Sequence, residues 1–360
     1  MERTTDICIV GAGPAGALLA TLLVRRGLHV TLIESSPSLG KAFRGEHVNE
    51  QGEAVLERHA LLAGVKARGM LPMTRLENWK DGVCYNTIFP EITVGHLGIH
   101  VPQRYLLAAI LEPIMQAPNF ELLLNTRMRE LLYDNKQVIG TVVEMNGERI
   151  SVHSKLVVGA DGRYSAVRKK AHIPYHTWEH GYDLLWARIP RPKDWEPIIR
   201  MALIDGKQLA LFTQAEDRIQ VGWNIDKGSF KEWRKQPFEP FIAQLKEAFP
   251  TLTDVVDDTI KSWSDFVLLD VHSSYADRWG GNGVVLLGDA AHTMTPTGAF
   301  GLNSALVDAE YLAAIITDEG TLSNAQIEQF EASRRSTIHH LQHEQLREEQ
   351  HFAQQFEAVH

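Results

Sequence analysis

The chain has 360 residues, of which 44% are hydrophobic, enough for one large two-lobed unit or two domains with a sizeable core. Its formal net charge of −9, without any run rich in Lys or Arg, excludes a general nucleic-acid binder. The lack of a transmembrane run of about 18 apolar residues, together with only two cysteines, predicts a cytoplasmic protein without stable membrane association.

A glycine-rich turn lies near the start of the chain, between a short apolar strand and an apolar helix. Gly11, Gly13 and Gly16 have the G-x-G-x-x-G spacing of a dinucleotide site. The first glycine permits the tight turn, the second lets a pyrophosphate approach the backbone, and the third lets the helix pack on the strand. Glu34 closes the next strand, where a carboxylate can bind a ribose hydroxyl. This context predicts a bound dinucleotide.

A second fingerprint of this kind is found in flavoprotein reductases that hold NAD(P)H in its own domain, and this sequence has none. The glycines at 280–283 precede a strand, which indicates a turn that leads into it. Cys8 lies within the first strand and Cys84 is far away in the sequence, so we expect no redox-active cysteine pair.

The middle of the chain alternates between helical and strand-like segments. One strand runs into Asp161 and Gly162, a second turn that carries an acid after a strand. From about 176 to 271 the pattern changes to strands rich in aromatic residues, interrupted by one amphipathic helix. The expected helices are 101–115, 163–170 and 240–249, and the expected strands are 120–125, 137–145 and 155–158.

Towards the end of the sequence, an apolar strand, an acidic turn at Gly288 and Asp289, and a glycine-rich entry into a helix follow one another directly. This succession suits a flavin, because the free N–H groups of a helix N-terminus interact with negative charge. A polar helix is expected at 324–355. His339 and His343 share one face of it without a third ligand, so we expect no metal site.

These motifs resemble the class A FAD-dependent aromatic monooxygenases of the para-hydroxybenzoate hydroxylase fold. Three signatures occur in that family's order, and the run PTGAFGLN at 296–303 looks like its version of the last one; the three are the opening fingerprint with Glu34, the Asp161-Gly162 turn continuing to Ser165 and Arg168, and the Gly288-Asp289 turn. The resemblance implies an α/β fold (α+β overall), in which a mostly antiparallel β-sheet substrate lobe is inserted into a Rossmann-like FAD-binding lobe. The expected divisions are 1–74, 101–175 and 272–323 for the FAD-binding lobe, 75–100 and 176–271 for the substrate lobe, and 324–360 for a C-terminal helix.

The resemblance also implies FAD as the cofactor, with NADPH or NADH as a transient electron donor. Asp289 is expected to accept a hydrogen bond from the ribityl chain, and Asp161 to lie where the cofactor phosphates and the incoming NAD(P)H meet. Arg104 and Arg44 are similar to family arginines that reach the cofactor. Arg44, which is expected to accompany flavin movement, and Pro296, expected beside the flavin ring, are the predicted catalytic residues. The full predicted cofactor-binding set is Gly11, Gly13, Ala15, Gly16, Glu34, Arg44, Arg104, Asp161, Asp289, Pro296, Gly298, Gly301, Leu302 and Asn303.

The implied activity is that of a flavin-dependent monooxygenase. NAD(P)H reduces the flavin, O2 adds to give a flavin C4a-hydroperoxide, and the distal oxygen passes to a small, electron-rich aromatic or heteroaromatic substrate. The protein must hold that ring near the flavin and exclude water. No motif marks a general base. The predicted substrate contacts are Trp186, Gln214 and Trp223, with Arg188, Gln220 and His100 as further candidates.

Other functions use the same nucleotide lobe and remain open on sequence alone. One is an FAD-dependent reductase of the geranylgeranyl reductase type, acting on a lipid. A halogenase is disfavoured, because Ala187 stands where the second tryptophan of the halogenase Trp-x-Trp-x-Ile-Pro motif belongs. A third is a flavin-binding redox regulator that controls a partner through the terminal helix. The expected partners are a small aromatic substrate and O2, with no nucleic acid, and the expected state is a monomer or a homodimer.

Overall fold

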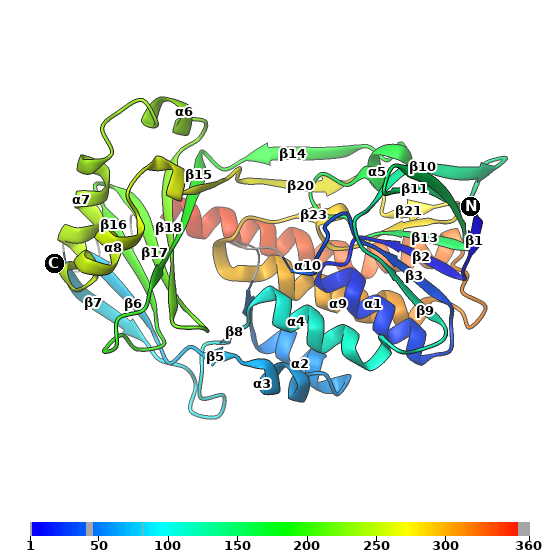
Figure 1. The fold of residues 1–360 in the computed structure, drawn as a ribbon, viewed down its shortest axis with the longest axis horizontal. Coiled ribbons are helices and arrows are strands. Elements are labelled where there is room, and N and C mark those ends of the chain that lie inside the picture. The colour runs from blue at the N-terminus through cyan, green and yellow to red at the C-terminus, as the bar shows by residue number, and fades with distance from the viewer. Residues whose placement is uncertain (1, 41–45, 81, 352–360) are drawn as a thin grey trace.

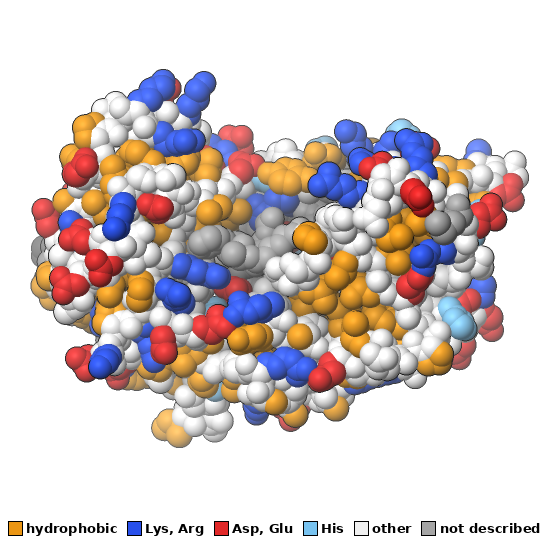
Figure 2. Space-filling model, viewed as in Figure 1, with side chains coloured by type: hydrophobic (Ala, Val, Ile, Leu, Met, Phe, Trp, Pro, Cys, Tyr) orange, Lys and Arg blue, Asp and Glu red, His pale blue; other side chains and the backbone are white. Residues whose placement is uncertain are grey.

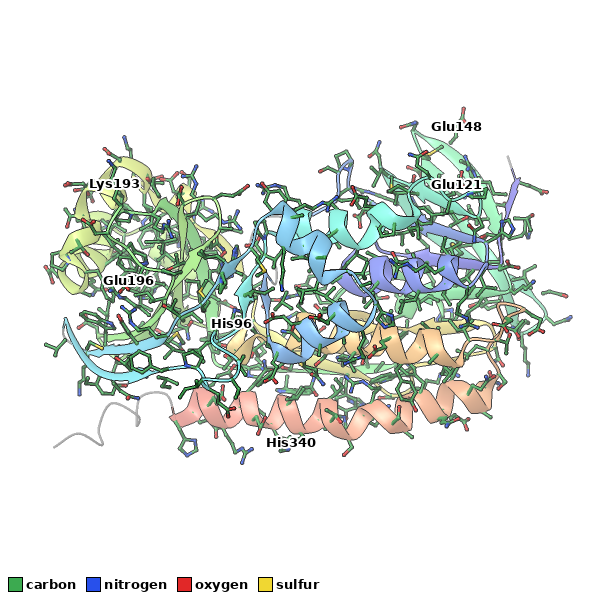
Figure 3. The ribbon with its side chains drawn as sticks, turned by 90° about the horizontal axis from the view of Figure 1, so that it is seen from below. His96, Glu121, Glu148, Lys193, Glu196 and His340 are labelled. Carbon is green, nitrogen blue, oxygen red and sulfur yellow. The ribbon has the colours of Figure 1, made fainter. Side chains whose placement is uncertain are left out.

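The computed structural model describes residues 2–40, 46–80 and 82–351. Two lobes lie end to end along the long axis, one built on a parallel sheet and the other on a larger, mostly antiparallel sheet (Figure 1). A long helix, α10 (Asn324–His351), runs along the first lobe and ends at the second (Figures 1 and 3). In the part of the chain that the structure describes, no helix combines the length and the apolar character needed to cross a bilayer.

The sheet of the first lobe has six strands. In spatial order they are β21 (Gly280–Gly281), β22 (Val284–Leu286), β13 (Leu156–Gly159), β2 (Ile7–Val10), β3 (Val30–Ile33) and β9 (Phe120–Leu123). All neighbours are parallel except β21 and β22. Every residue of β22, β13, β2 and β3 is buried, as expected for a parallel sheet covered on both faces. Because these four strands are parallel, the turns that follow them leave from one edge of the sheet.

Helices and a second, four-stranded sheet cover this parallel sheet. The helices are α1 (Pro14–Arg25), α2 (Glu50–Arg58), α3 (Leu62–Arg68), α4 (Gln103–Leu111), the 3-10 turn η1 (Glu112–Ile114), α5 (Ala166–Lys170) and α9 (Phe300–Ile315). The second sheet has the order β1 (Glu2–Thr4), β12 (Glu148–His153), β11 (Gln137–Met145) and β10 (Thr126–Asp134). One buried apolar cluster includes Leu19 of α1, Ile9 of β2, Val143 of β11 and Leu306 of α9, so these layers share a core.

The second lobe is a seven-stranded sheet with helices on one face. In spatial order its strands are β19 (Val267–Leu269), β15 (Tyr182–Pro190), β18 (Arg218–Asp226), β17 (Lys207–Gln214), β16 (Ile199–Ile204), β6 (Leu76–Lys80) and β7 (Val83–Ile88). Its helices are α6 (Phe230–Trp233), α7 (Glu239–Ala248), η2 (Pro250–Leu252), α8 (Thr253–Thr259) and η3 (Trp263–Asp265). Leu185 and Trp223 pack with Phe241 of α7 in this lobe's core, whereas Trp186 belongs to a separate cluster on the opposite face. We call that opposite face, which carries Trp186, the lobe-facing side.

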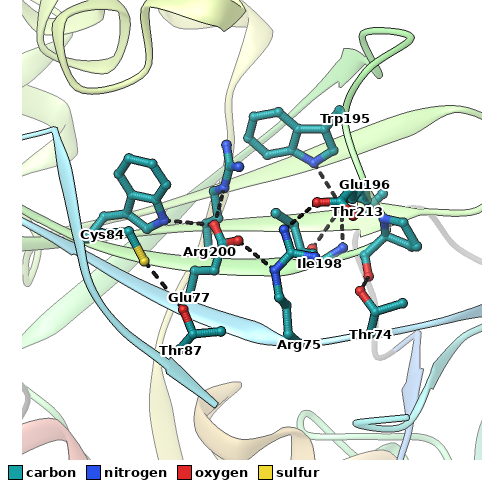
Figure 4. A network of polar contacts seen from close by, with 12 residues as sticks. Thr74, Arg75, Glu77, Cys84, Thr87, Trp195, Glu196, Ile198, Arg200 and Thr213 are labelled. Carbon is teal, nitrogen blue, oxygen red and sulfur yellow. Dashed lines mark hydrogen bonds and ion pairs between the residues drawn. The ribbon is translucent and has the colours of Figure 1, made fainter. Parts of the chain in front are cut away.

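A buried polar network joins β6 to β16, which are the two parallel neighbours in this sheet (Figure 4). The Glu77 carboxylate accepts hydrogen bonds from Arg75 and Arg200, both at 2.8 Å, and from the indole N–H of Trp79 at 3.0 Å. Burial raises the pKa of Glu77, but the bonds from Arg200, Trp79 and Arg75 outweigh it and the pKa is lowered. Arg200 also lies over the ring of Trp195 at 3.9 Å. These contacts compensate the buried charges and fix the strand pair.

Two small sheets connect the lobes. One has the order β14 (Tyr175–Glu179), β20 (His272–Ala276) and β23 (His292–Thr293), and its first two strands extend between the lobes in Figure 1. The other has the order β4 (His47–Val48), β8 (Ile99–His100) and β5 (Leu71–Pro72). Short 3-10 turns η4 (Gly288–Ala290) and η5 (Thr297–Ala299) follow β22 and β23 along the chain.

The predicted α/β fold with a mostly antiparallel second sheet is confirmed. The strand expected at 137–145 is β11, and the helix expected at 240–249 is α7. The helix expected at 101–115 is shorter, because Pro102 precedes it and Pro113 falls in the 3-10 turn that ends it. The helix expected from 163 begins at Ala166, after Gly162 with a positive φ of 83°.

Candidate active site

Four motif turns meet at one edge of the parallel sheet. Gly11 follows β2, Asp161 follows β13, Gly288 follows β22 and Glu34 follows β3. The turns are in close contact: a Cβ on Gly11 would lie 2.3 Å from the carbonyl oxygen of Ala160. A Cβ on Gly288 would lie 3.1 Å from the Cβ of Ala305 in α9 and 3.6 Å from that of Ala15 in α1. Motifs far apart in the sequence therefore form one surface.

Two glycines of the opening turn are required by packing within the protein, and the third is not. Gly11 has φ +105°, and Gly16 lies so close to the turn that its Cβ would be 2.0 Å from the Gly11 carbonyl oxygen, so packing within the protein requires both. Gly13 has an extended backbone with φ −71°, and nothing lies within 4 Å of where its Cβ would be. No side chain caps the N-terminus of α1. An open backbone face at an uncapped helix N-terminus fits a pyrophosphate, which explains a glycine that the protein itself does not need.

Glu34 lies beside the same turn. Its carboxylate is 9% exposed and accepts hydrogen bonds from the backbone N–H groups of Ala12, at 3.1 Å, and Ser36, at 2.8 Å. These bonds fix the acid next to the glycine turn. The geometry fits the predicted contact with a ribose hydroxyl.

Asp161 has a structural role in the turn after β13. Its carboxylate caps α5, accepting from the N–H groups of Ala166 at 2.6 Å and Val167 at 3.1 Å and from the Ser165 hydroxyl at 2.5 Å. Arg168, only 3% exposed, then donates to the Ala290 carbonyl oxygen at 2.7 Å and so ties this turn to the Gly288 turn. Both Asp161 oxygens are thus engaged at the start of α5, and its contact with the cofactor phosphates stays a prediction.

The N-terminus of α9 faces the same edge. Gly298 and Ala299 both have positive φ, 69° and 54°, which turns the chain sharply into the helix, and no side chain caps it. A Cβ on Gly301 would lie 3.9 Å from a carboxylate oxygen of the half-buried Asp289, so the first turn of α9, with Gly301 and Leu302, lies beside that acid. Half-buried Pro296 precedes this turn. Free N–H groups next to Asp289 suit the polar edge of a flavin.

Asn303 holds α9 in place through its side chain, which is 1% exposed. The amide donates to the carbonyl oxygens of His47 at 3.2 Å and Ala299 at 2.8 Å and accepts from the N–H of Asn49 at 3.1 Å. All its side-chain groups are engaged within the protein. Its role at the predicted flavin site is therefore to anchor the helix N-terminus.

The structure describes only one of the two predicted arginines. Arg44 lies outside the described residues. Arg104 is at the start of α4, its side chain 51% exposed, paired with Glu216 in the turn between β17 and β18 and lying over the Tyr105 ring at 4.6 Å. A Cβ on Gly40 would be 2.7 Å from the Cα of Arg104, so Arg104 lies against Gly40.

A buried polar cluster around Glu46 joins the lobes at the lobe-facing side of the second sheet. No role for Glu46 was predicted from the sequence. Glu46, 8% exposed, accepts from Arg188 at 2.7 Å, Gln214 at 3.1 Å and His100 at 3.4 Å. The other ring nitrogen of His100 accepts from the Ala215 N–H at 3.0 Å, so Nε2 carries the proton donated to Glu46. Burial raises the pKa of Glu46, but His100 and Arg188 outweigh it and the pKa is lowered. Gln214 also donates to Gln220 at 2.6 Å.

The two predicted tryptophans lie on opposite faces of the second sheet. Trp186 is on the lobe-facing side, 7% exposed, with its ring over Gly222, whose Cβ would be 2.6 Å from it. Phe212 lies next to it at 6.3 Å between ring centroids. Trp223, 1% exposed, packs on Phe241 of α7 at 4.2 Å in the helix-covered core, so we do not propose it as a substrate contact. Figure 2 shows the outline of the molecule dipping where the two lobes meet.

Comparison with known proteins agrees with this geometry. The chain matches a family described as FAD binding domain over residues 4–344. It is 35% identical over 309 residues to a 6-methylpretetramide 4-monooxygenase of Streptomyces rimosus, covering 85% of this chain and 73% of that protein. A para-nitrophenol 4-monooxygenase of Pseudomonas sp. strain WBC-3 is 24% identical over 333 residues, covering 87% of this chain and 78% of that protein.

Solved structures show the same fold. PqsL of P. aeruginosa, in complex with 2-aminobenzoylacetate, superposes with a TM-score of 0.82 at 22% identity, covering 99% of this chain and all of that one (100%). The prediction of FAD as the cofactor and of the monooxygenase class is confirmed by the family match and by the relatives. The chain belongs to the FAD binding domain family, as a class A flavin-dependent aromatic monooxygenase.

Proposed function

We propose that this monooxygenase hydroxylates a phenol-type aromatic ring held between the lobe-facing side of the second sheet and the motif edge of the first. The observation that carries this proposal is the Glu46 cluster. Its bonds to Arg188 and Gln214 bring the sheet face that bears Trp186 next to the first lobe. The names of the two relatives, 6-methylpretetramide 4-monooxygenase and para-nitrophenol 4-monooxygenase, support an aromatic substrate.

On the cofactor side, we assign FAD to the lobe formed by 1–74, 101–175 and 272–323, and substrate to 75–100 and 176–271. When bound, FAD supplies the redox chemistry, because it can take electrons from NAD(P)H and activate O2. Glu34 would hold the ribose, the Gly13 turn with the α1 N-terminus the pyrophosphate, and Asp289 with the N–H groups of Gly301 and Leu302 the flavin end. We also place Arg44, Arg104 and Pro296 near the cofactor.

On the substrate side, the chain orients the ring and excludes water. Trp186 and Phe212 provide an apolar, aromatic surface on which a second ring can pack. The buried Glu46 cluster would close one boundary of this space with polar side chains that bind one another. Excluding water there favours transfer of oxygen to the substrate over loss of hydrogen peroxide.

The test follows NADPH and NADH oxidation and O2 uptake by the purified flavoprotein with a panel of aromatic compounds that includes 6-methylpretetramide and para-nitrophenol. We expect one class of compound to accelerate NAD(P)H oxidation and to yield a product heavier by one oxygen atom in mass spectrometry. If none of the compounds accelerates NAD(P)H oxidation and the enzyme reduces a polyprenyl lipid, the protein is a lipid reductase and this proposal is wrong. A flavin that is reduced by NAD(P)H and reoxidised with hydrogen peroxide as the sole product of O2, without conversion of any aromatic or lipid substrate, would point to a redox regulator.

Trp186 and Trp223 form a matched pair for locating the substrate. We expect Trp186→Phe to change kcat/KM for rings of different size by about tenfold, because the floor of the proposed substrate space changes shape. Trp223→Phe makes the same chemical change in the helix-covered core. It should lower the thermal midpoint and leave the ranking of substrates unchanged. Equal substrate rankings in both variants would remove Trp186 from the site.

A further inference from the structure

The helix α10 presents a polar face to the protein interior. Gln342 and Gln345 are 2% and 0% exposed, although both are polar. Gln342 donates to the carbonyl oxygens of Ser274, at 3.1 Å, and Thr293, at 2.9 Å. His340, on the outer side of the same helix in Figure 3, has a side chain that is 66% exposed. The buried stripe therefore serves a particular segment of the chain and is not a solvated face.

That segment is 293–297, which joins β23 to η5. Gln345 accepts from the Thr295 N–H at 3.2 Å and donates to the carbonyl oxygens of Thr295 and Thr297, at 2.9 Å and 2.5 Å. β23 ends at Thr293, so the strand ladder stops before this point. Buried backbone polar groups outside a ladder need other partners, and α10 provides them. The conformation of this segment therefore depends on α10.

Glu349, one turn further along α10, binds side chains on both sides of Pro296. One carboxylate oxygen accepts from the hydroxyls of Thr295 at 2.7 Å, Thr297 at 2.8 Å and Tyr182 at 2.9 Å. The other is 2.6 Å from Nδ1 of His180, whose side chain is fully buried. One carboxylate thus joins α10, the start of β15 and the residues that flank Pro296.

The charge of this cluster is well defined. The Glu349 side chain is only 10% exposed, and burial raises its pKa, but the bonds from His180, Thr295 and Thr297 outweigh burial and the pKa is lowered. Burial and the neighbouring Glu349 raise the pKa of Tyr182, which therefore stays protonated and donates. Nε2 of His180 lies 2.8 Å from the Ser273 hydroxyl, which completes the ring's hydrogen bonding. An ionised carboxylate with four donors is a strong, directional anchor.

We propose that Glu349 is a positioning residue that fixes Pro296 and the entry to α9 from outside the site, by binding the hydroxyls of Thr295 and Thr297. The inference rests on the proposed function in one respect, namely that Pro296 lies beside the flavin. It adds that the terminal helix determines where this flavin-facing segment stands. Loss of the carboxylate then loosens the segment without removing any group that touches cofactor or substrate.

The test uses Glu349→Ala and Glu349→Gln, with Glu344→Ala as the matched control. Glu344 is on the same helix but pairs only with His340 and Arg347 among the described contacts. Glutamine keeps an oxygen for the three hydroxyls, and a neutral His180 can accept from its amide by changing tautomer. Hydrogen exchange of the 293–298 amides, in protein stripped of flavin, reports the segment itself. FAD titration and the flavin absorption spectrum report its effect on the cofactor.

We expect Glu349→Ala to exchange the 293–298 amides at least about tenfold faster than Glu344→Ala, with FAD bound about tenfold more weakly (about 1.4 kcal/mol) and an altered flavin spectrum. Glu349→Gln should lie between Glu349→Ala and the wild type. Unchanged exchange in Glu349→Ala, relative to Glu344→Ala, overturns the positioning role. Faster exchange with unchanged FAD affinity and spectrum leaves the contact intact but places Pro296 away from the flavin, which counts against the proposed function instead. If Glu349→Ala does not fold, Thr297→Val makes the same comparison.

Discussion

Gly13→Val is expected to yield a folded protein that binds FAD about ten- to a hundredfold more weakly, or about 1–3 kcal/mol. The added side chain enters open space in the protein, since nothing lies within 4 Å of the Cβ position, and the backbone is extended, so the fold tolerates it. The same side chain occupies the space proposed for the pyrophosphate. Titration of the stripped protein with FAD, followed by fluorescence quenching, measures the loss.

Gly11→Ala is the control, because it changes a glycine of the same turn that the protein itself requires. Its Cβ would lie 2.3 Å from the Ala160 carbonyl oxygen, at a φ of +105°. This variant should lower the thermal midpoint of the flavin-free protein, which Gly13→Val should not do. If Gly13→Val bound FAD as tightly as wild type, the pyrophosphate would have to be placed elsewhere.

Asp308→Ala is expected to destabilise the protein by about 3–5 kcal/mol. Asp308, on α9, is fully buried and accepts from Arg334 of α10 at 2.7 Å, while its other oxygen lies 2.6 Å from Nε2 of His292. The substitution leaves the buried arginine without its carboxylate. Denaturation by urea, compared with wild type, gives the difference.

A double variant separates charge from packing at this position. Asp308→Leu with Arg334→Met removes both charges and should recover part of the stability, because a buried pair can be replaced by apolar groups of similar size. Recovery is incomplete because His292, buried beside Asp308, loses its hydrogen-bond partner. A single Asp308→Ala variant within about 1 kcal/mol of wild type would contradict the argument, since a buried unpaired charge costs more than that.

The pH dependence of the Asp308 effect has a defined sign. Burial raises the pKa of Asp308, but His292 and Arg334 outweigh it and the folded-state pKa is lowered. The unfolded value is about 3.9. The stabilisation is therefore fully present above that value and is lost as the pH falls through the folded pKa. The stability difference between wild type and Asp308→Ala should therefore shrink as the pH falls below about 4.

The motif turns were predictable from sequence because each is local. Gly11, Asp161 and Gly288 each follow an apolar strand within a few residues, and parallel pairing then brings them to one edge. The faces of the second sheet were not predictable in the same way. Trp186 pairs with Gly222, which places the next residue, Trp223, on the opposite face. Alternation shows that neighbours point apart, but the register and the position of the helices decide which face meets the other lobe.

Glu46 and the polar stripe of α10 were missed for a different reason, although the partners of Glu46 were among the candidate substrate residues. The bond from Gln214 to Glu46 spans 168 positions of the sequence, and no spacing rule links the two. Gln342, Gln345 and Glu349 lie on one face of a helix that looks solvated by composition. Their partners are carbonyl and hydroxyl groups of an irregular segment, which leaves no periodic signal.

The order of the strands has a consequence for how the enzyme is made. β2 spans Ile7–Val10, but its neighbour β13 comes only at Leu156–Gly159, and the next strand, β22, at Val284–Leu286. Segment 293–297 lacks its hydrogen-bond partners until Gln345 and Glu349 have also been made. A nascent chain therefore exposes an incomplete nucleotide sheet until the residues of β22 have been made. We therefore expect flavin capture to follow the emergence of Gln345 and Glu349 from the ribosome.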